Sequence, residues 1–492
     1  MQKIELVREG LPFVRDRDER LVSYNIEMTE VTGGTFWKEY SPAQIEGTEE
    51  VPKIVSFTDI SSMMQFYPPV DLTEEKIRCY AKALGKAWVR VSGSWATGTY
   101  YDFDGHTGGK IPEGYRAVLT KEQWTNLLDF VREVDAKLLI SVSNCPGDHV
   151  DGKPWTPEQA KLLFDFSRDY GVPIAAAEFM NEPNIMAMTP PAENYGLAEF
   201  CRDQDTFFRF VKENYPDVLL VGPCACGDAI TDRQKELQHA MRAYPTEELM
   251  KGCQVLPDTF SYHCYTGISE RGAAMGGHWS AEDALTEPYL GTMAAAAAYY
   301  ADLRDKFCPG AQLWVTESAD AGMGGNTWGS TYLDVLRFAD ELASFAQITD
   351  GVIFHNTLAS SDYGLLDHKT HQPRPNYWLC YVWNQLVGTK VYESGFTNRE
   401  GAHVYAASRK DGQPGYVYIV LNTSRTDSLE VQLPEGSQMY QLSSPALRSQ
   451  EICLNGQTLV RSADGTMPLL QPQTLAAGTQ VLAPATVTFV VV

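Results

Sequence analysis

Residues 178–184 read EFMNEPN and residues 313–318 read LWVTES. In both stretches a short apolar run, typical of a buried parallel strand, leads to a glutamate, Glu182 in the first and Glu317 in the second. Loop-forming residues follow each glutamate. Because the carboxyl ends of the strands in one parallel barrel point at the same cavity, we expect both carboxylates to face that cavity.

Short apolar runs alternate with longer amphipathic runs from about residue 21 to residue 387. The short runs read as strands, and apolar residues spaced i, i+3, i+4 predict helices in the longer runs. Strands that alternate with helices pair in parallel, and eight of them close a (β/α)8 TIM barrel, so we predict this α/β fold. The predicted strands are 21–28, 87–93, 137–144, 174–180, 218–224, 258–265, 312–317 and 351–356, and the predicted helices are 73–84, 122–134, 157–170, 197–215, 293–307 and 332–345.

The character of the sequence changes after residue 387. Short segments of β-branched and aromatic residues lie between turn-rich stretches, and no helical spacing is visible. We predict a catalytic barrel over residues 21–387, a C-terminal all-β sandwich domain over residues 388–492, and a strand within residues 1–20 that joins the sandwich. A length of 492 residues is the usual size of two domains.

The chain is strongly acidic, since 63 Asp and Glu against 40 Lys and Arg give a formal charge of −23. Such a charge repels DNA, RNA and sulfated polysaccharides, so we expect no nucleic-acid partner. No apolar stretch is long enough to span a membrane, and no signal peptide is visible. Ten cysteines are scattered without a disulfide framework. These features favour a soluble cytoplasmic protein without a membrane partner, and they leave its oligomeric state open.

Two carboxylates in one cavity suit a glycosidase that retains the anomeric configuration of its substrate. One acid protonates the leaving oxygen, and the other carboxylate attacks the anomeric carbon. We assign Glu182 as the acid/base and Glu317 as the nucleophile. The alternative for Glu182 is a strand-end glutamate paired with an arginine. Asn181, directly before the acid, is a candidate to bind the sugar 2-hydroxyl.

The strand predicted before the nucleophile ends in SYHCY at residues 261–265. A tyrosine hydroxyl at this rim could keep Glu317 ionised and oriented, because a hydrogen bond to a carboxylate favours its charged form. We choose Tyr265 for this role, with Tyr262 and His263 as further candidates. Core packing is the alternative for each of these aromatic side chains.

Two other acids and one glycine-rich stretch lie near the predicted pair. Glu178 lies four residues before Glu182 on the same strand face, about 13 Å deeper, so we interpret it as structural. Asp320, in the loop after Glu317, is either a substrate contact or a loop residue. The segment 322–325 reads GMGG, which could bind a carboxylate through backbone amides or could be a turn that needs positive φ.

The sequence gives no sign of a cofactor or a metal. It contains no Gly-x-Ser-x-Gly elbow and no glycine-rich nucleotide motif before a helix. The pair Cys224 and Cys226 is too closely spaced for a zinc ribbon, and the nine histidines show no ligand spacing. We therefore predict catalysis without a cofactor and without a metal.

Further motifs resemble those of the family 79 glycoside hydrolases, which include heparanase and microbial β-glucuronidases. The matching stretches near the predicted pair read NEPN at 181–184, YHCY at 262–265, and TES at 316–318 followed by glycines at 324 and 325. More specific matches read SDYGLLD at 361–367, PNYWL at 375–379 and LVGTKV at 386–391. The likeness covers the predicted barrel and the start of the predicted β domain.

The resemblance implies retaining hydrolysis of β-linked glucuronic acid, with the acid/base and nucleophile roles as assigned above. It also implies that backbone amides of Gly324 and Gly325, together with the Tyr363 hydroxyl, bind the uronate carboxylate. Further sugar contacts would fall on Glu27 in the first strand and Ser94 after the second, with Asn181 at the 2-hydroxyl.

The chain departs from the family pattern at three places. Glu27 stands where a shorter aspartate is expected, Met28-Thr29 replaces a polar pair, and the loop after Glu317 is one residue longer. These departures concern recognition of the ring hydroxyls and leave the catalytic pair unchanged.

Within the family, endo-acting enzymes on heparan need basic clefts, and this chain is acidic. We therefore predict an exo-β-glucuronidase that acts on glycans or small glucuronide conjugates through a covalent glycosyl-enzyme intermediate. The alternatives are an endo-acting heparanase-like enzyme, a retaining β-glycosidase for neutral sugars, and a non-catalytic carbohydrate-binding barrel. Residues 39–55, 189–195 and 272–279 are expected to form loops on the aglycone side.

Overall fold

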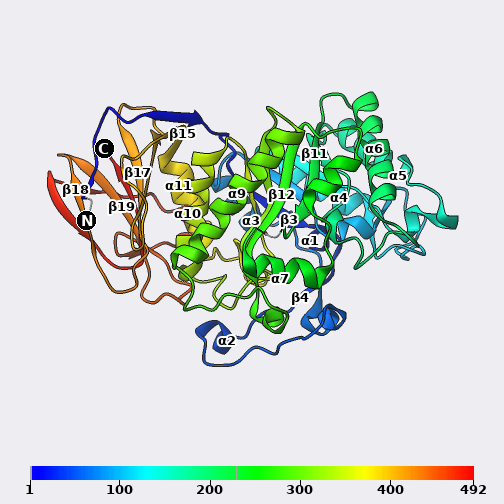
Figure 1. The fold of residues 1–492 in the computed structure, drawn as a ribbon, viewed down its shortest axis with the longest axis horizontal. Coiled ribbons are helices and arrows are strands. Elements are labelled where there is room, and N and C mark those ends of the chain that lie inside the picture. Colours follow the sequence, from blue (N-terminus) through cyan, green and yellow to red (C-terminus); the bar gives the residue numbers. More distant parts are fainter. Residues whose placement is uncertain (1–2, 229) are drawn as a thin grey trace.

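A closed barrel of eight parallel strands forms the centre of the computed structural model, which describes residues 3–228 and 230–492 (Figure 1). Each strand overlaps one of the predicted segments, and the strands follow one another around the barrel in chain order. The predicted TIM barrel is confirmed. Its strands are β3 (Val22–Glu27), β6 (Ala87–Ser92), β9 (Ala136–Ser141), β10 (Ala176–Glu178), β11 (Leu219–Cys226), β12 (Thr259–Ile268), β13 (Gln312–Gly322) and β14 (Ile353–His355).

Nearly all residues of the barrel strands are buried, because one face of each strand fills the barrel interior and the other face packs beneath the helices. All residues of β3 and β6 are buried. The six predicted helices are present, and five further helices, α1, α2, α7, α8 and α11, lie outside the predicted helical segments. The helices are α1 (Met28–Thr32), α2 (Pro42–Glu46), α3 (Glu75–Ala83), α4 (Lys121–Glu133), α5 (Glu158–Asp169), α6 (Leu197–Asn214), α7 (Asp232–Met241), α8 (Thr246–Gly252), α9 (Glu287–Phe307), α10 (Tyr332–Ile348) and α11 (Pro375–Leu386).

Two further sheets, of nine and three strands, pack on each other at the end of the molecule that carries both chain termini (Figure 1). In β18, residues 429, 431 and 433 are buried and those between them are exposed, as expected of a strand with one face on a core. The strands are β1 (Ile4–Glu5), β2 (Phe13–Asp16), β15 (Val387–Tyr392), β16 (His403–Arg409), β17 (Tyr416–Asn422), β18 (Leu429–Leu433), β19 (Ser437–Ser443), β20 (Cys453–Leu454), β21 (Gln457–Thr458), β22 (Gln473–Leu475), β23 (Gly478–Leu482) and β24 (Thr486–Val491).

The N-terminal segment contributes to these sheets. The strand β1 pairs in parallel with β18, and β2 pairs antiparallel with β15. Residues 1–2 of the predicted segment lie outside the described residues. The domain boundaries at residues 20 and 387 stay predictions.

Long insertions follow the first two barrel strands, at the carboxyl end where a TIM barrel builds its site. The insertion after β3 contains a two-stranded antiparallel sheet, β4 (Gly34–Trp37) with β5 (Met64–Tyr67). The insertion after β6 contains a second small sheet, β7 (Thr99–Asp102) with β8 (Ala117–Thr120). The ring of Phe36 in the first insertion packs edge to face against the ring of Trp95 in the second insertion, with ring centroids 4.9 Å apart. The two insertions therefore form one continuous wall.

None of the helices in the described part of the chain combines the length and the apolar character needed to cross a lipid bilayer. All ten cysteines are free, and most of them are buried.

His403 connects the β domain to two helices of the barrel. Its Nδ1 lies 2.5 Å from Asp340 Oδ1 on α10, and its Nε2 lies 3.1 Å from Glu287 Oε1 on α9. Burial disfavours the charged ring, but the hydrogen bond and charge of Asp340, followed by those of Glu287, raise the pKa of His403 to about 9. The charged histidine thus joins the sheet to the barrel at neutral pH.

This ion pair predicts a pH-dependent stability. A folded-state pKa of about 9 lies above the unfolded value of about 6.5, so the stabilisation is complete below about pH 6.5 and is lost as the pH rises through about 9. We expect His403→Gln to lower the free energy of unfolding by about 3 kcal/mol at pH 6 and by much less at pH 10. Urea denaturation of both proteins at the two pH values measures this difference, and a pH-independent difference would contradict it.

Candidate active site

The two predicted catalytic glutamates line one cavity of about 1130 Å³. Glu317 belongs to β13 and pairs in register with His263 of β12. Glu182 follows β10 and precedes the short 3-10 helix Pro183–Ile185, with a left-handed backbone at φ 47° and ψ 55°. This conformation is strained for a residue with a Cβ, and such strain concentrates where a side chain must be aimed at a site.

His263 joins the two carboxylates. Its Nδ1 lies 3.0 Å from Glu182 Oε1 and 3.5 Å from Glu317 Oε2. One nitrogen of the histidine and one oxygen of each glutamate all lie within 4.8 Å of one another. The other ring nitrogen, Nε2, lies 3.3 Å from Arg90 Nη2. A guanidinium only donates, so Nε2 accepts, and Nδ1 carries the proton that faces the carboxylates.

Arg90, on β6, is a fully buried cation beneath the pair. Its Nη1 donates to Glu317 Oε1 at 3.0 Å, and its Nη2 donates to Asn181 Oδ1 at 2.8 Å. Its Nε and Nη2 also donate to Glu178 Oε1, at 3.0 and 2.5 Å. A buried charge needs such partners, because an unpaired one is strongly destabilising. Arg90 therefore fixes the predicted nucleophile and Asn181, and Glu178 acts as its structural counter-ion.

A second chain of hydrogen bonds runs from the nucleophile to Tyr363. The Tyr265 hydroxyl donates to Glu317 Oε2 at 2.7 Å. Asn356 Nδ2 donates to the hydroxyl oxygens of both tyrosines, at 3.0 Å for Tyr265 and 3.2 Å for Tyr363. The Tyr363 hydroxyl is an acceptor in this chain, so its proton is available to a ligand.

These contacts determine the charge of the nucleophile. Burial favours the neutral form of Glu317, but its interactions with His263 and Arg90 and the hydrogen bond from Tyr265 hold the pKa below its ordinary value. Burial and the charge of Glu317 raise the pKa of the Tyr265 hydroxyl well above 10, so the tyrosine stays a donor. At neutral pH, Glu317 is thus an ionised carboxylate, as a nucleophile requires.

Glu27 and Ser94, the predicted ring contacts from the first two barrel strands, both line the cavity. Glu27 is 3% exposed, and its Oε2 has no hydrogen-bond partner among the described groups. Burial and the negative charge of Glu317 raise the pKa of Glu27 well above its ordinary value, which favours the neutral form of this acid. A Cβ at Gly93 would lie 1.6 Å from Glu27 Oε2, so the glycine makes room for this longer acid.

Gly324 and Gly325 lie beside the cavity, whose lining includes Met323 and Tyr363 but neither glycine. Both glycines have positive φ, 85° and 86°, which a turn of this kind requires. A Cβ at Gly325 would approach the Tyr363 backbone nitrogen to 3.2 Å. The glycines thus bring the loop close to Tyr363, and carboxylate binding by their amides stays a prediction.

Asp320 is fully buried and is absent from the cavity lining. Its Oδ2 accepts from the backbone nitrogen of Asn326 at 2.7 Å, which closes the loop after β13. Asp320 thus lies within β13 and not in a loop after Glu317, as the sequence analysis expected, and its absence from the lining does not support a contact with the substrate. Tyr262 packs inside the protein against Tyr300, with ring centroids 4.0 Å apart, and is a core residue.

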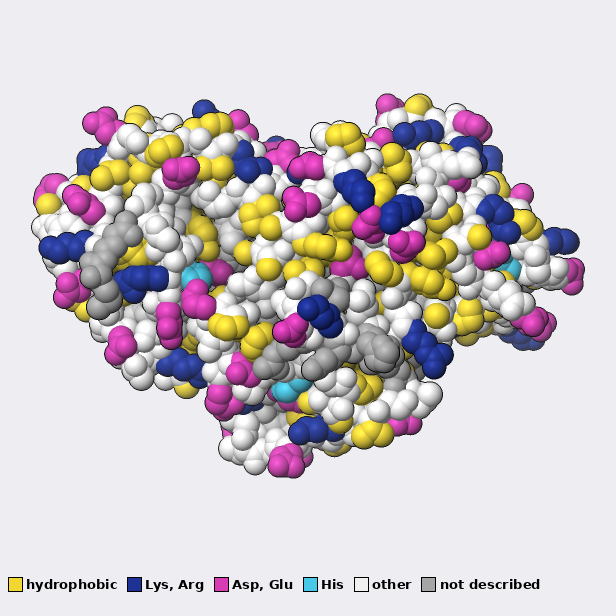
Figure 2. Space-filling view, viewed as in Figure 1, with side chains coloured by type: hydrophobic (Ala, Val, Ile, Leu, Met, Phe, Trp, Pro, Cys, Tyr) yellow, Lys and Arg dark blue, Asp and Glu magenta, His cyan; other side chains and the backbone are white. Residues whose placement is uncertain are grey.

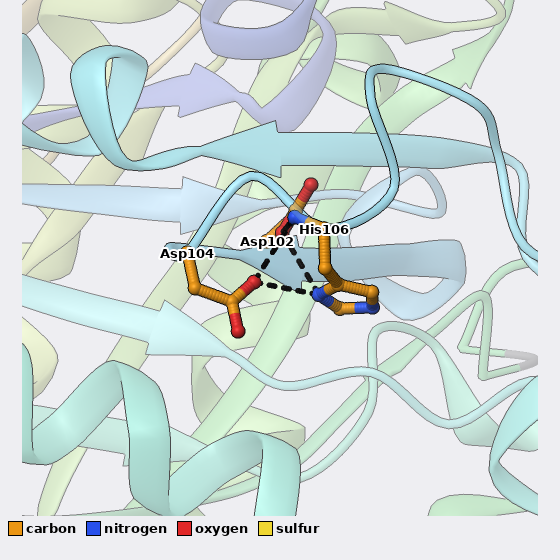
Figure 3. A group of neighbouring side chains, drawn as sticks. All are labelled: Asp102, Asp104 and His106. Atoms are coloured by element: carbon orange, nitrogen blue, oxygen red, sulfur yellow. Dashed lines mark hydrogen bonds and ion pairs between the residues drawn. The ribbon is translucent and has the colours of Figure 1, made fainter.

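Two groups of side chains in the described residues have ligand atoms close enough to hold a metal ion. One group is Glu182, His263 and Glu317. The positive charge of Arg90, 3.0 Å from Glu317 Oε1, disfavours binding of a metal cation there. The other is Asp102, Asp104 and His106, after β7 (Figure 3). There Asp102 accepts from the backbone nitrogens of His106 and Thr107, at 3.1 and 3.2 Å. Such side-chain bonds to the following backbone stabilise a turn and account for this group.

Sequence reasoning missed Arg90 and Asn356. Arg90 is the only charge in the strand AWVRVS, and a charge inside a buried strand is a signal that could have identified it. Asn356 follows β14, and a polar residue at the carboxyl end of a barrel strand is the same signal that identified the glutamates. His263, only a further candidate from sequence, lies between the two carboxylates.

Individual relatives are found, although no model of a known protein family matches the chain. Over 397 residues it is 21% identical to Baicalin-beta-D-glucuronidase of Scutellaria baicalensis. This alignment covers 72% of this chain and 69% of the relative. Over 268 residues it is 27% identical to Heparanase of Gallus gallus, covering 51% of this chain and 49% of that protein. Over 211 residues it is 26% identical to Inactive heparanase-2 of Homo sapiens, covering 38% and 36%. These relatives confirm the resemblance predicted from the motifs.

Solved structures share the fold over the whole chain. A 4-O-alpha-L-rhamnosyl-beta-D-glucuronidase from Fusarium oxysporum 12S superposes with a TM-score of 0.63 at 11% identity, covering 99% of this chain and 100% of the other. An arabinofuranosidase from Xanthomonas axonopodis pv. citri superposes with a TM-score of 0.60 at 16% identity, covering 100% of both chains. The arrangement of a barrel with a β domain therefore has precedents among glycoside hydrolases of different specificity.

Proposed function

We propose that this chain, a glycoside hydrolase similar to those of family 79, is a retaining exo-β-glucuronidase that removes terminal glucuronic acid. The observation that carries the proposal is the approach of Glu182 and Glu317 to within 4.8 Å, measured between one oxygen of each. Retaining glycosidases hold their carboxyl groups about 5–5.5 Å apart, whereas inverting enzymes leave about 6.5–9.5 Å for a water molecule. The short spacing supports double displacement.

In the first step, a carboxylate oxygen of Glu317 attacks the anomeric carbon. The bond from that carbon to the leaving oxygen breaks, and the proton of Glu182 moves to this oxygen, so the aglycone leaves as an alcohol. The product is an ester between the sugar and the enzyme, of inverted configuration. Arg90 and Tyr265 hold separate oxygens of Glu317, so either oxygen keeps a defined position during the attack.

In the second step, the carboxylate of Glu182 takes a proton from water, and the water oxygen attacks the anomeric carbon. The ester bond to Glu317 breaks, its carboxylate is restored, and the sugar leaves with its original β configuration. His263 Nδ1 lies 3.0 Å from Glu182 Oε1 and stabilises the carboxylate that acts as base.

The cavity also supports recognition of an anionic sugar. The raised pKa of Glu27 favours its neutral form and so limits the negative charge close to the sugar, and Arg90 offsets part of the charge of Glu317. The Tyr363 hydroxyl has a proton to donate to the uronate carboxylate. Asn181 Oδ1 is occupied by Arg90, which leaves its Nδ2 to donate to the sugar 2-hydroxyl.

The charge of the cavity favours exo action on unsulfated substrates. Among the described lining residues, Arg116 is the only Lys or Arg. On the face shown in Figure 2, Lys and Arg side chains lie among Asp and Glu side chains rather than in a continuous track. An endo-acting enzyme on a sulfated chain needs several cations along its cleft, because each sulfate must be neutralised.

Hydrolysis of 4-nitrophenyl β-glucuronide, compared with the matching β-glucoside, tests this assignment. We expect kcat/KM to be at least about 100-fold higher for the glucuronide, because each lost charge-assisted contact costs about tenfold or more. Faster turnover of the glucoside would support the neutral-sugar alternative. No turnover of either would support the non-catalytic alternative, which one relative named as inactive also suggests.

The Tyr363→Phe variant separates carboxylate recognition from the chemistry. It removes the hydroxyl that lies 3.2 Å from Asn356 Nδ2 and leaves the ring in place. We expect KM for the glucuronide to rise about tenfold while kcat changes little, since the hydroxyl touches neither catalytic glutamate. Steady-state kinetics on both glycosides check this result, and equal effects on the glucoside would contradict a carboxylate contact.

A further inference from the structure

The wall of the active-site cavity away from the catalytic pair is mostly apolar, although Thr32, Thr35, Thr120 and Gln123 also line it. The two insertions after β3 and β6, which meet at Phe36 and Trp95, supply most of it. Phe66 and Ile111 stand on these insertions, and Met188 stands on the loop after Glu182. We call these three residues, together with Met64, Val118 and Ile185, the apolar wall; all six line the cavity.

The apolar wall is open to solvent. Phe66 is 69% exposed, Ile111 is 54% exposed and Met188 is 37% exposed. Large apolar side chains scattered singly over a surface are normal, but several of them gathered around one cavity indicate an interaction site. The structure therefore provides apolar surface that a ligand, rather than the protein itself, would cover.

The position of this wall identifies the part of the substrate that would meet it. The acid must lie next to the leaving oxygen, so the aglycone extends from the sugar on the side of Glu182. Ile185 and Met188 follow Glu182 within six residues and line the same cavity. The proposed polar partners of the sugar are instead Glu317, Asn181 and Tyr363, none of which belongs to the apolar wall. The apolar wall is thus on the aglycone side.

The chemistry of the wall selects among aglycones. A polysaccharide aglycone would need many hydrogen-bonding groups, and a sulfated one would need cations. Apart from the glutamates at positions 27, 182 and 317, the only charged residues in the described lining are Arg116 and Asp228. The exposed Phe66 ring offers a flat surface that suits another aromatic ring.

We propose that the apolar wall binds an aromatic aglycone, so that the preferred substrates are glucuronides of aromatic alcohols rather than oligosaccharides. This inference rests on the proposed exo-β-glucuronidase activity and adds the substrate class to it. The ring of the aglycone packs against Phe66, Ile111 and Met188, while its glycosidic oxygen receives the proton from Glu182.

The test compares phenyl and 2-naphthyl β-glucuronides, whose alcohols are similar in acidity and differ in apolar area, with methyl β-glucuronide and a glucuronyl disaccharide. We expect kcat/KM to be about tenfold higher for the naphthyl than for the phenyl compound. In the double variant Phe66→Ala, Ile111→Ala this ratio should fall to about one, while kcat/KM for methyl β-glucuronide stays unchanged. Phe13→Ala is the control, because Phe13 is 54% exposed, as Ile111 is, but lies on β2 and does not line the cavity.

Each outcome decides one of the two proposals. Equal kcat/KM for the naphthyl and phenyl compounds, or a higher value for the disaccharide, would overturn the aromatic aglycone while leaving the glucuronidase intact. A double variant that keeps the wild-type ratio would also overturn it, because the wall would then make no contact. Failure to hydrolyse any glucuronide would instead overturn the proposed function.

Discussion

Replacing the nucleophile by its amide, Glu317→Gln, is expected to lower kcat for an aryl β-glucuronide by at least about 10³-fold. The amide is neutral and a poor nucleophile, so no ester with the sugar forms. The fold should survive, because the Gln oxygen can still accept from Arg90 while its NH2 group donates to the hydroxyl oxygen of Tyr265. Circular dichroism and thermal unfolding check the fold, and the control Glu430→Gln alters an exposed glutamate of β18.

A shorter variant at the same position makes the assignment more specific. In Glu317→Gly the lost side chain leaves space for azide, which can attack the anomeric carbon while Glu182 protonates the leaving oxygen. The product is then an α-glucuronyl azide, because only one displacement has occurred. Recovery of activity with azide and an α product by NMR would support the nucleophile. A β product, or unchanged activity of Glu317→Gln, would show that another group attacks.

The barrel could be predicted from the sequence because its signal is repeated and local. Each strand is a short apolar run between longer amphipathic runs, so an error at one boundary does not change the count. The glutamates at 182 and 317 were found by their position at the end of such a run alone, and the structure places them in one cavity. The fold class and the convergence of the pair were therefore accessible without coordinates.

The remainder of the site depends on contacts that no local pattern encodes. Arg90 lies on a different strand from each residue that it binds, and the chain separations are 88 residues to Glu178 and 227 to Glu317. The raised pKa of Glu27 results from burial and from the charge of Glu317, which are properties of the assembled cavity. Such features follow from the closure of the barrel and are invisible along the chain.

The loops on the aglycone side also depend on contacts that the local sequence pattern does not encode. Of the three predicted segments, 189–195 and 272–279 each contribute one lining residue, Thr189 and Gly277, and 39–55 contributes none. Ile60, Met64 and Phe66 line the cavity instead. Glycine and proline mark where the chain turns, but the pairing of β4 with β5 decides which side of the insertion faces the cavity.

Removing the acid, Glu182→Ala, is expected to have an effect that depends on the leaving group. An aglycone that leaves readily as an anion needs no proton, so formation of the glycosyl-enzyme should be nearly unaffected with 2,4-dinitrophenyl β-glucuronide. A poor leaving group needs the proton, and kcat/KM for the phenyl compound should fall by about 10²–10⁴-fold. Steady-state kinetics over a series of phenols of graded acidity measures this dependence as the slope of log kcat/KM against phenol pKa.

The same variant should also lose the base of the second step. The glycosyl-enzyme then accumulates with the good leaving group, which lowers kcat and KM together and produces a burst of phenol. Azide needs no base, so it should attack the accumulated ester, restore kcat and yield a β-glucuronyl azide after two displacements.

The substitution Asn181→Ala, at the position next to Glu182, removes a sugar contact without removing a proton donor, so it should lower kcat/KM equally for all phenols. If Glu182→Ala behaved in the same uniform way, position 182 would be a binding residue and the proton donor would have to be sought elsewhere in the cavity.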